Sequence, residues 1–312
     1  MTLTQLEYVV ALERYRHFAL AAEKCFITQP TLSMQIQKLE EELGVKLFDR
    51  TKQPVIPTEM GELVVAQARK VLWEAERIPK LIEEQQDILS GELRLGIIPT
   101  LAPYLLPALY ATIREKYPQL HLHVKEMITE EIVQSLKNNW LDCGLVVTPL
   151  EDASIKEDPL FFEELYLFVS ESHPWYKKAS IKANELQPHE IWLLEEGHCF
   201  RSQVIHLCGS GKDVSIAFKY ESGSLETLKR MVLLNKGMTV LPQLAVNELP
   251  NSQRAMVKKI QGPVPVRQVS LVTHRDHVKT KLIQTLREEI LLVVPPSMKK
   301  LHNKEIIPVG NG

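Results

Sequence analysis

The sequence has few of the features that mark secreted or membrane-embedded proteins. Its 312 residues contain only four cysteines, too few for a disulfide scaffold at this length, and this favours a reducing compartment. Apolar runs such as Ile290–Val294 are far too short to span a bilayer. Residues 1–7 have neither the basic segment nor the apolar core of a signal peptide. We therefore expect a cytoplasmic protein with no membrane partner.

The chain also lacks an excess of either charge. Its 37 lysine and arginine residues face 39 aspartate and glutamate residues, a formal net charge of −2, so the overall field does not indicate a nucleic-acid partner. The first 60 residues are balanced too, with seven basic and eight acidic side chains. With 45% hydrophobic and 24% charged residues, the composition is typical of a soluble globular protein, and the length predicts two or three domains.

Two of the four cysteines lie nine positions apart in the segment Gly197–Cys208. His198 precedes Cys199 and Arg201 follows it by two residues. A cation near a thiol stabilises the thiolate, which is the reactive form. Cys208 follows a mainly apolar run and is expected to be buried. This arrangement predicts a redox switch in which Cys199 is oxidised to a sulfenic acid and Cys208 then resolves it as a disulfide.

The spacing of these cysteines sets a mechanical constraint. If residues 199–208 are helical, nine steps hold the two Cα atoms about 13 Å apart, whereas a disulfide tolerates at most about 7 Å. Bridging would then unwind the segment. Two unrelated buried thiols remain an alternative. A zinc site is a third, although its candidate ligands, His198, Cys199, His206 and Cys208, lack the usual spacing. We expect neither a metal nor a cofactor.

Residues 1–57 predict a small all-α domain. Apolar residues at helical spacing indicate helices over 4–14 and from 18, and a third helix begins at Thr28 and ends at Gly44. Its apolar face is formed by Leu32, Ile36, Leu39 and Leu43. The opposite face carries amides, hydroxyls and a lysine, which suit a DNA major groove, and an ordinary solvated bundle is the alternative. The candidate DNA contacts, including a basic turn after the helix, are Gln29, Pro30, Thr31, Ser33, Met34, Gln35, Lys38, Arg50 and Lys52.

The same region closely resembles the winged helix-turn-helix of LysR-type transcriptional regulators. The resemblance covers about 50 residues without a gap, at Ala21–Ala22, Gln29–Ser33, Gln35–Ile36, Leu39–Glu40, Leu43–Gly44 and Leu47–Arg50. It implies a recognition helix beginning near Gln29, DNA sites with two-fold symmetry, and dimers or tetramers. Oligomerisation also answers the objection from charge, because several weakly basic modules on one DNA multiply their affinities.

Residues 58–90 are predicted to form a linker helix that begins at Thr58. Its apolar residues follow the spacing of a coiled-coil seam, and they are Val64, Ala68, Val71, Ala75, Ile78 and Ile82. A second copy of the same helix is the simplest partner for such a seam, which predicts a dimer. Packing against the chain's own domains is the alternative.

Residues 91–300 predict an α/β effector domain. Strand-like runs alternate with helical segments, as in a parallel sheet, and a second alternation begins near residue 165. The run 269–273 is expected to return to the first sheet, so that lobe I takes residues 91–163 and 268–296 and lobe II takes residues 164–267. This is the two-lobed, periplasmic-binding-protein-like layout that LysR-type regulators have. Residues 301–312 are expected to be a flexible tail.

The segment Gly197–Gln203 with Cys208, followed by Ser224–Leu228, is similar to the peroxide-sensing OxyR branch of that family. The likeness reaches from the N-terminus to about residue 295. It implies that Cys199 is the peroxidatic thiol and Cys208 the resolving thiol. Hydroxyl and cationic groups would stabilise the hydroxide that leaves when the O–O bond breaks. The residues that match such a pocket are Thr100, Thr129, His198 and Arg201, with Arg267 a further candidate.

We therefore predict a hydrogen-peroxide-sensing transcriptional regulator rather than an enzyme. Oxidation would refold the effector domain and change how a homodimer or homotetramer, joined through the linker helix and the effector domain, contacts promoter DNA. RNA polymerase is a further expected partner. The chain departs from the sensor pattern at Ser202 and at Gly209–Gly211, and the glycines predict a more flexible loop. The alternatives are a LysR-type regulator that binds a small metabolite in the inter-lobe cleft and a thiol peroxidase with an appended oligomerisation module.

Overall fold

The chain divides into two compact units, residues 1–87 and residues 88–312. The structure is a computed structural model, and it describes residues 1–83, 90–186, 191–208, 223–234, 237–277, 279–301 and 304–308. The loop predicted at Gly209–Gly211 lies outside the described residues, as does the end of the predicted linker helix.

Unit 1 contains the three predicted helices followed by a short hairpin and a long helix. The elements are α1 (Leu3–Tyr15), α2 (Phe18–Lys24), α3 (Gln29–Leu43), β1 (Phe48–Asp49), β2 (Ile56–Pro57) and α4 (Glu59–Glu83). Leu32, Ile36 and Leu39 of α3 are fully buried, which confirms three positions of the predicted apolar face. Leu43 is 39% exposed because the helix passes beyond the core before Gly44 ends it with a left-handed φ of +69°.

The cap of α3 differs from the prediction. Thr28 occupies the N-cap position, but its side chain makes no capping hydrogen bond to the helix backbone. Its hydroxyl lies 2.8 Å from the hydroxyl of Thr31 instead. The hydroxyl of Thr31 is thereby engaged at the start of the helix.

The first half of the predicted seam of α4 packs against the core of unit 1. Ala68 is 2% exposed in the unit 1 core, and Val64 and Val71 pack against the same core. Here α4 lies on α1, so packing against the chain's own domain, the alternative left open above, holds for this half. Further along the helix Ile78 is 65% exposed. The second half of the seam is therefore the part that leaves an apolar side chain for a partner.

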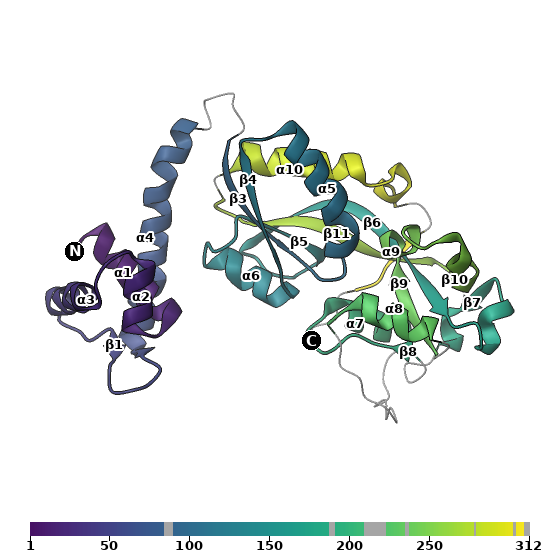
Figure 1. Cartoon of the computed structure of the whole chain (residues 1–312), viewed down its shortest axis with the longest axis horizontal. Coiled ribbons are helices and arrows are strands. Elements are labelled where there is room, and N and C mark those ends of the chain that lie inside the picture. Colours follow the sequence, from purple (N-terminus) through teal and green to yellow (C-terminus); the bar gives the residue numbers. More distant parts are fainter. Residues whose placement is uncertain are drawn as a thin grey trace. The chain divides into compact units, whose positions relative to one another are not determined.

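Unit 2 is built on one mixed sheet whose main path has the order β4-β3-β5-β11-β6-β10-β7. Its first lobe contains β3 (Gly91–Ile97), α5 (Ala102–Lys116), β4 (Leu120–Glu126), α6 (Thr129–Lys137), β5 (Cys143–Thr148) and α10 (Thr280–Val293). Its second lobe contains β7 (Ser180–Lys182), β8 (Ile191–Trp192), α7 (Cys199–Leu207), α8 (Leu225–Leu233), β9 (Met238–Pro242), α9 (Gln243–Asn247) and β10 (Val257–Gln261). Helices α5 and α10 lie together on one side of the first lobe's sheet and α6 on the other (Figure 1). A separate hydrophobic cluster fills each lobe.

Two long strands join the lobes. β6 (Ile155–Val169) pairs with β11 (Val264–His274) over its first part and with β9 and β10 over its last part. In the antiparallel register of β6 and β11, Glu163 lies directly opposite Arg267. These two charged residues therefore face each other where β6 passes from one lobe to the other.

The predicted flexible tail is wrong for the residues that the structure describes after 303. Lys304–Ile306 form strand β12, which pairs in parallel with Val264–Val266 of β11. Ile307 is 5% exposed within the lobe II cluster. Ile306 and Ile307 follow a polar stretch of the sequence. The burial of Ile307 depends on β11, a strand about 40 residues earlier, and the local composition gives no sign of this pairing.

Candidate functional site

Cys199 is the first residue of α7, and Cys208 follows the last residue of the same helix. Both thiols are free. Cys199 is partly buried against the lobe I cluster, whereas Cys208 is 8% exposed within the lobe II cluster. Because the segment between them is helical, the separation of about 13 Å derived above applies, and a disulfide between them requires α7 to unwind.

Arg267 is the cation that acts on Cys199. Burial raises the pKa of the Cys199 thiol, while the Thr129 hydroxyl and the Arg267 charge both lower it, and burial is the strongest of these effects. The guanidinium carbon of Arg267 lies 5.1 Å from the ring centre of Phe200, the residue after Cys199. The Phe200 ring therefore shields part of the Arg267 guanidinium from water near the Cys199 thiol.

Arg267 is held by a buried network of hydrogen bonds. Its Nε donates to Oε2 of Glu163 at 2.8 Å, and neither side chain has any exposed surface. Its Nη1 donates to the Thr100 hydroxyl at 2.7 Å, and its Nη2 donates to the Thr100 carbonyl at 3.2 Å. The second carboxylate oxygen of Glu163 accepts the backbone N–H of Leu244 at 2.8 Å. Thr100 thus helps to hold Arg267 in place.

Thr129 lies beside the thiol at the first position of α6. Its hydroxyl favours the thiolate of Cys199, and its buried oxygen completes no well-formed hydrogen bond among the described residues. A buried hydroxyl without a partner is costly unless a water or a ligand satisfies it. The assignment of Thr129 to a peroxide pocket stays a prediction, and its buried hydroxyl is free to bind a water or a ligand.

The side chain of Arg201 points away from Cys199, although the two residues are close in sequence. Its Nη1 donates to the carbonyl of Leu194 at 3.0 Å. Two steps along a helix turn the side chain by about 200°, to the opposite face. His198 is 8% exposed at the N-cap position, and its Nε2 lies 3.5 Å from Oε1 of Glu195. The role of these two residues at Cys199 stays a prediction, and Arg267 is the candidate whose charge favours the Cys199 thiolate.

Sequence reasoning missed Glu163 and Phe200. A signal for Glu163 was present, since alternate residues of a strand share one face. Glu163 stands between Phe161 and Leu165 on β6, and these two side chains are at most 1% exposed. A carboxylate on a buried face needs a cation, and this pattern predicts a buried arginine or lysine nearby.

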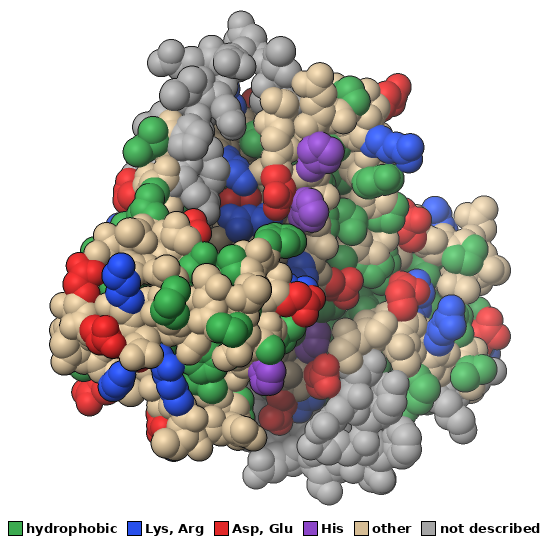
Figure 2. Space-filling model, turned by 60° about the vertical axis from the view of Figure 1, so that its left-hand side comes forward, with side chains coloured by type: hydrophobic (Ala, Val, Ile, Leu, Met, Phe, Trp, Pro, Cys, Tyr) green, Lys and Arg blue, Asp and Glu red, His purple; other side chains and the backbone are tan. Residues whose placement is uncertain are grey.

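The candidate DNA contacts of α3 divide into exposed and engaged side chains. Gln29, Pro30, Met34 and Lys38 are exposed. Oε1 of Gln35 accepts a hydrogen bond from the buried Gln5 at 3.3 Å. On the face shown in Figure 2, lysine and arginine side chains are interspersed with acidic ones and form no single basic patch. This agrees with the balanced charge of the sequence.

The matches to known families decide the identity. Residues 3–62 match the family described as bacterial regulatory helix-turn-helix protein, lysR family, and residues 86–293 match the LysR substrate binding domain. The chain belongs to the LysR family.

Relatives of this LysR-type regulator are named OxyR or hydrogen peroxide-inducible genes activator. It is 40% identical over 276 residues to the hydrogen peroxide-inducible genes activator of Haemophilus influenzae, covering 87% of this chain and 90% of the relative. It is 38% identical over 273 residues to the DNA-binding transcriptional dual regulator OxyR of Escherichia coli, covering 87% and 89%. The structure of full-length OxyR C199D from Pseudomonas aeruginosa is similar with a TM-score of 0.78 and 37% identity, over 94% of this chain and 95% of that one. The predicted OxyR branch and fold class are confirmed.

The wing of the LysR-type module depends on a buried carboxylate. Oε1 of Glu40, in the last turn of α3, accepts the backbone N–H groups of Leu47 at 2.9 Å and Phe48 at 3.3 Å. Its Oε2 accepts from Lys46 at 3.1 Å and from Arg50 at 3.3 Å. Glu40 is 3% exposed. It fixes the strand that leads into the wing, and it binds one of the predicted DNA-contact residues, Arg50.

Arg50 and Ser33 are also engaged with each other. Nη1 of Arg50 donates to the Ser33 hydroxyl at 3.2 Å, and its guanidinium lies 5.3 Å from the ring centre of Phe18. Lys52, in the turn between β1 and β2, is exposed. Arg50 and Ser33 thus support the wing within the protein, and Lys52 offers a charge at its surface.

Glu40→Ala is expected to destabilise unit 1 by about 2–3 kcal/mol, because the buried N–H groups of Leu47 and Phe48 lose their acceptor. Urea unfolding of the full chain, followed by circular dichroism, measures the change. Glu41→Ala is the matched control, since its side chain is exposed, and it should stay within about 0.5 kcal/mol of the unchanged chain. Equal losses for the two variants would contradict the role assigned to Glu40.

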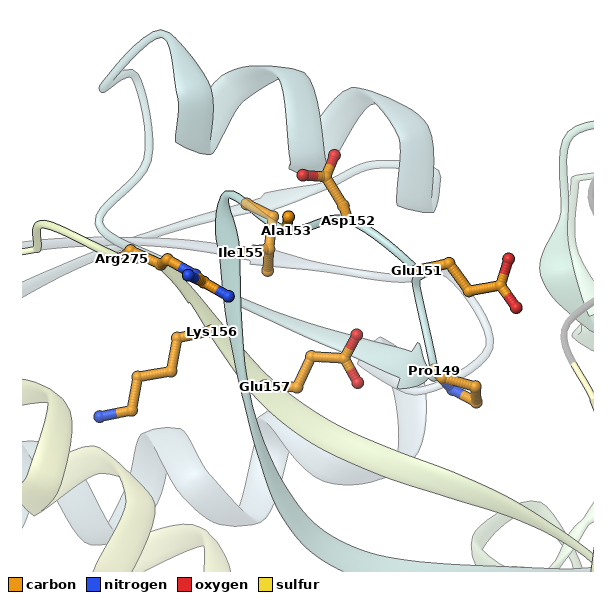
Figure 3. Close-up of a pocket in the computed structure, with 8 residues that line it drawn as sticks. All are labelled: Pro149, Glu151, Asp152, Ala153, Ile155, Lys156, Glu157 and Arg275. Carbon is orange, nitrogen blue, oxygen red and sulfur yellow. The ribbon is translucent and has the colours of Figure 1, made fainter.

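A hollow on lobe I lies apart from the thiol site of this regulator. It is lined by Pro149, Glu151, Asp152, Ala153, Ile155, Lys156, Glu157 and Arg275, none of which belongs to the predicted peroxide pocket. The charged ends of Glu151, Asp152 and Lys156 point in different directions (Figure 3), and Asp152 is paired with Lys137 at 2.6 Å. The hollow therefore has no set of polar groups that converge on one ligand.

No group of three or more histidine, cysteine, aspartate or glutamate side chains among the described residues is arranged to hold a metal ion. No helix of the described ranges combines the length and the apolar character needed to cross a bilayer. The family itself is one of transcriptional regulators.

Proposed function

We propose that this regulator is a DNA-binding transcriptional activator that responds to hydrogen peroxide through Cys199 and Cys208. The observation that carries the proposal is the placement of two free thiols at the ends of one helix, each packed against a different lobe. The names of the relatives, hydrogen peroxide-inducible genes activator among them, support the signal.

In the first step, the Cys199 thiolate attacks one oxygen of hydrogen peroxide. The S–O bond forms and the O–O bond breaks, so that the sulfur loses two electrons and becomes a sulfenic acid. The leaving hydroxide takes up a proton and becomes water. Arg267 favours the thiolate that this step requires. The buried hydroxyl of Thr129 provides a hydrogen bond to the bound peroxide, which stabilises the developing charge.

In the second step, Cys208 attacks the sulfur of the sulfenic acid as its thiolate. The S–S bond forms, the S–O bond breaks, and the leaving hydroxide is protonated to water. Since a disulfide cannot span an intact helix of this length, α7 unwinds and the effector domain refolds. The refolded domain changes how a homodimer or homotetramer contacts promoter DNA and RNA polymerase. The exposed Ile78 of α4 supports a subunit contact there.

The contact between the lobes favours a small oxidant over a larger metabolite. Tyr104 of α5 packs against both hydrophobic clusters. Its hydroxyl donates to Glu226 of α8 at 2.6 Å, and the amino group of Lys229 lies 5.9 Å from its ring centre. Burial and the neighbouring carboxylate raise the pKa of Tyr104, so this bridge keeps its proton at neutral pH. It occupies space that a metabolite between the lobes would need.

Cys199→Ser is expected to abolish the change in promoter binding that peroxide causes, while the variant still binds DNA. Peroxide titration with footprinting of promoter DNA, together with mass spectrometry of the thiols, measures both effects. Cys143→Ala is the control, because Cys143 lies fully buried in β5 and should leave the response intact. A response by Cys199→Ser, or a promoter response with both thiols still free, would reject the proposal. Continuous peroxide consumption with a reductant would favour a thiol peroxidase instead.

A further inference from the structure

The C-terminal segment 304–307 contacts three of the elements that build the thiol site, namely β11, β6 and α7. β12 pairs with β11, the strand of Arg267. The backbone N–H of Ile307 donates to the carbonyl of Val266 at 2.8 Å. The amino group of Lys304 lies 3.1 Å from Oε1 of Glu164, next to Glu163 on β6. The segment is thereby fixed to both of the long strands that join the lobes.

A side-chain hydrogen bond connects this segment to α7. Nε2 of Gln203 donates to the carbonyl of Ile307 at 3.1 Å. Gln203 is fully buried and lies four residues after Cys199, about one helical turn further along. It stands between the two cysteines in the part of the helix that a disulfide must unwind.

The hydrogen bond is the only polar anchor that Gln203 has among the described residues. Its other amide atom, Oε1, is buried without a partner there. A buried amide that is only half satisfied stabilises its surroundings weakly. The contact between α7 and the C-terminal segment is thus positioned to hold the helix and also to release it.

We propose that residues 304–307 act as a C-terminal strap that holds α7 helical and so limits the rate at which Cys208 reaches Cys199. The proposal rests on the function proposed above. Oxidation of Cys199 leaves α7 in place, and Cys208 attacks only when the helix opens. Opening breaks the bond between Gln203 and Ile307, whereas the strap remains paired with β11. Gln203 is in this sense a positioning residue for the second step of the reaction.

The strap predicts different effects on the two steps. Gln203→Met keeps the length of the side chain and removes the donor together with the unsatisfied oxygen. The open form of α7 then becomes more populated, and the disulfide should form roughly fivefold faster, the factor for one lost hydrogen bond. The formation of the sulfenic acid, measured in a Cys208→Ser background, should change by less than about twofold, because the contacts of Cys199 are untouched.

Rapid quench of the full chain with peroxide, alkylation of free thiols and mass spectrometry follow both steps separately. His206→Gln, at an exposed position of the same helix, is the matched control and should leave both rates unchanged. A chain that ends at Leu301 removes the whole strap and should form the disulfide at least as fast as Gln203→Met. If that shortened chain does not fold, Gln203→Met alone decides the matter.

Each outcome bears on one proposal only. If the unchanged chain forms a sulfenic acid but no disulfide between Cys199 and Cys208, the proposed function fails at its second step. If the unchanged chain forms the disulfide and Gln203→Met forms it at the same rate or more slowly, the strap is rejected and the proposed function stands. An equal increase of both rates would also reject the strap, since the effect would then lie on the thiol.

Discussion

Arg267→Met is expected to destabilise unit 2 by about 3–5 kcal/mol, the loss seen when one partner of a buried ion pair is removed. Arg267 and Glu163 have no exposed surface, so the substitution leaves a carboxylate in the protein interior without its cation. The loss also includes the hydrogen bonds to Thr100. Urea unfolding of the full chain, read by the fluorescence of the tryptophans and by circular dichroism, measures the change.

The double variant Arg267→Met with Glu163→Gln separates the lost charge pair from the lost packing. The amide at 163 needs no cation and still has an oxygen for the backbone N–H of Leu244, so most of the stability should return. Arg275→Met, at an exposed position after the end of β11, is the control and should have little effect. If the double variant is as unstable as Arg267→Met, the buried carboxylate is not the cause of the loss.

The same double variant tests the effect of Arg267 on the thiol. The charge of Arg267 lowers the pKa of Cys199, so its removal lets burial raise this pKa further. The thiolate fraction at neutral pH then falls, and the sulfenic acid forms more slowly in the same proportion. A folded double variant with the original rate would show that Arg267 serves only the stability of the protein.

The second large effect is on the pH dependence of disulfide formation. Burial raises the pKa of the Cys208 thiol to about 12, well above the ordinary value of about 8.5. A thiol whose pKa is raised in the helical state stabilises the helix as long as the thiol keeps its proton. The full stabilisation is present below the ordinary pKa of the thiol, and it is lost as pH rises toward the raised pKa. The unwound form of α7, in which Cys208 is exposed, therefore becomes more favourable throughout this window.

The rate of disulfide formation from preformed sulfenic acid should thus rise about tenfold per pH unit from about pH 7 to about pH 10, without levelling near 8.5. Quenched-flow alkylation at each pH measures it. A small-molecule thiol that attacks the same sulfenic acid in a Cys208→Ser chain is the reference, since its rate levels off at its own pKa. A plateau near 8.5 for the intramolecular reaction would mean that Cys208 is already exposed before it reacts.

The parts that sequence reasoning predicted well are those set by local patterns. The helices of unit 1 follow from apolar residues three and four positions apart, and Gly44 ends α3 as expected because it adopts a left-handed backbone. The two cysteines also lie within ten residues of each other, and α7 meets the condition under which the sequence analysis placed their Cα atoms about 13 Å apart. For such features, the positions along the chain are enough to predict how the residues are arranged in the fold.

The parts it predicted poorly depend on contacts between distant segments. Arg267 comes from a strand 68 positions after Cys199, whereas the nearby Arg201 is turned away by the helix. β12 forms because β11 offers it an edge, and no periodicity within residues 301–312 shows that edge. Glu163 is an intermediate case, since the alternation in β6 indicates its burial but not its partner.

The attachment of the two sulfurs to different cores has a consequence for the timing of the signal. On the proposed function, a single oxidation event at Cys199 leaves the fold intact until Cys208 has left the lobe II cluster. During that interval a cellular thiol can reduce the sulfenic acid and return the regulator to its starting state. A brief exposure to oxidant then leaves the conformation of the effector domain unchanged. Only an exposure that lasts longer than the time α7 needs to open leads to the disulfide and to a change of conformation.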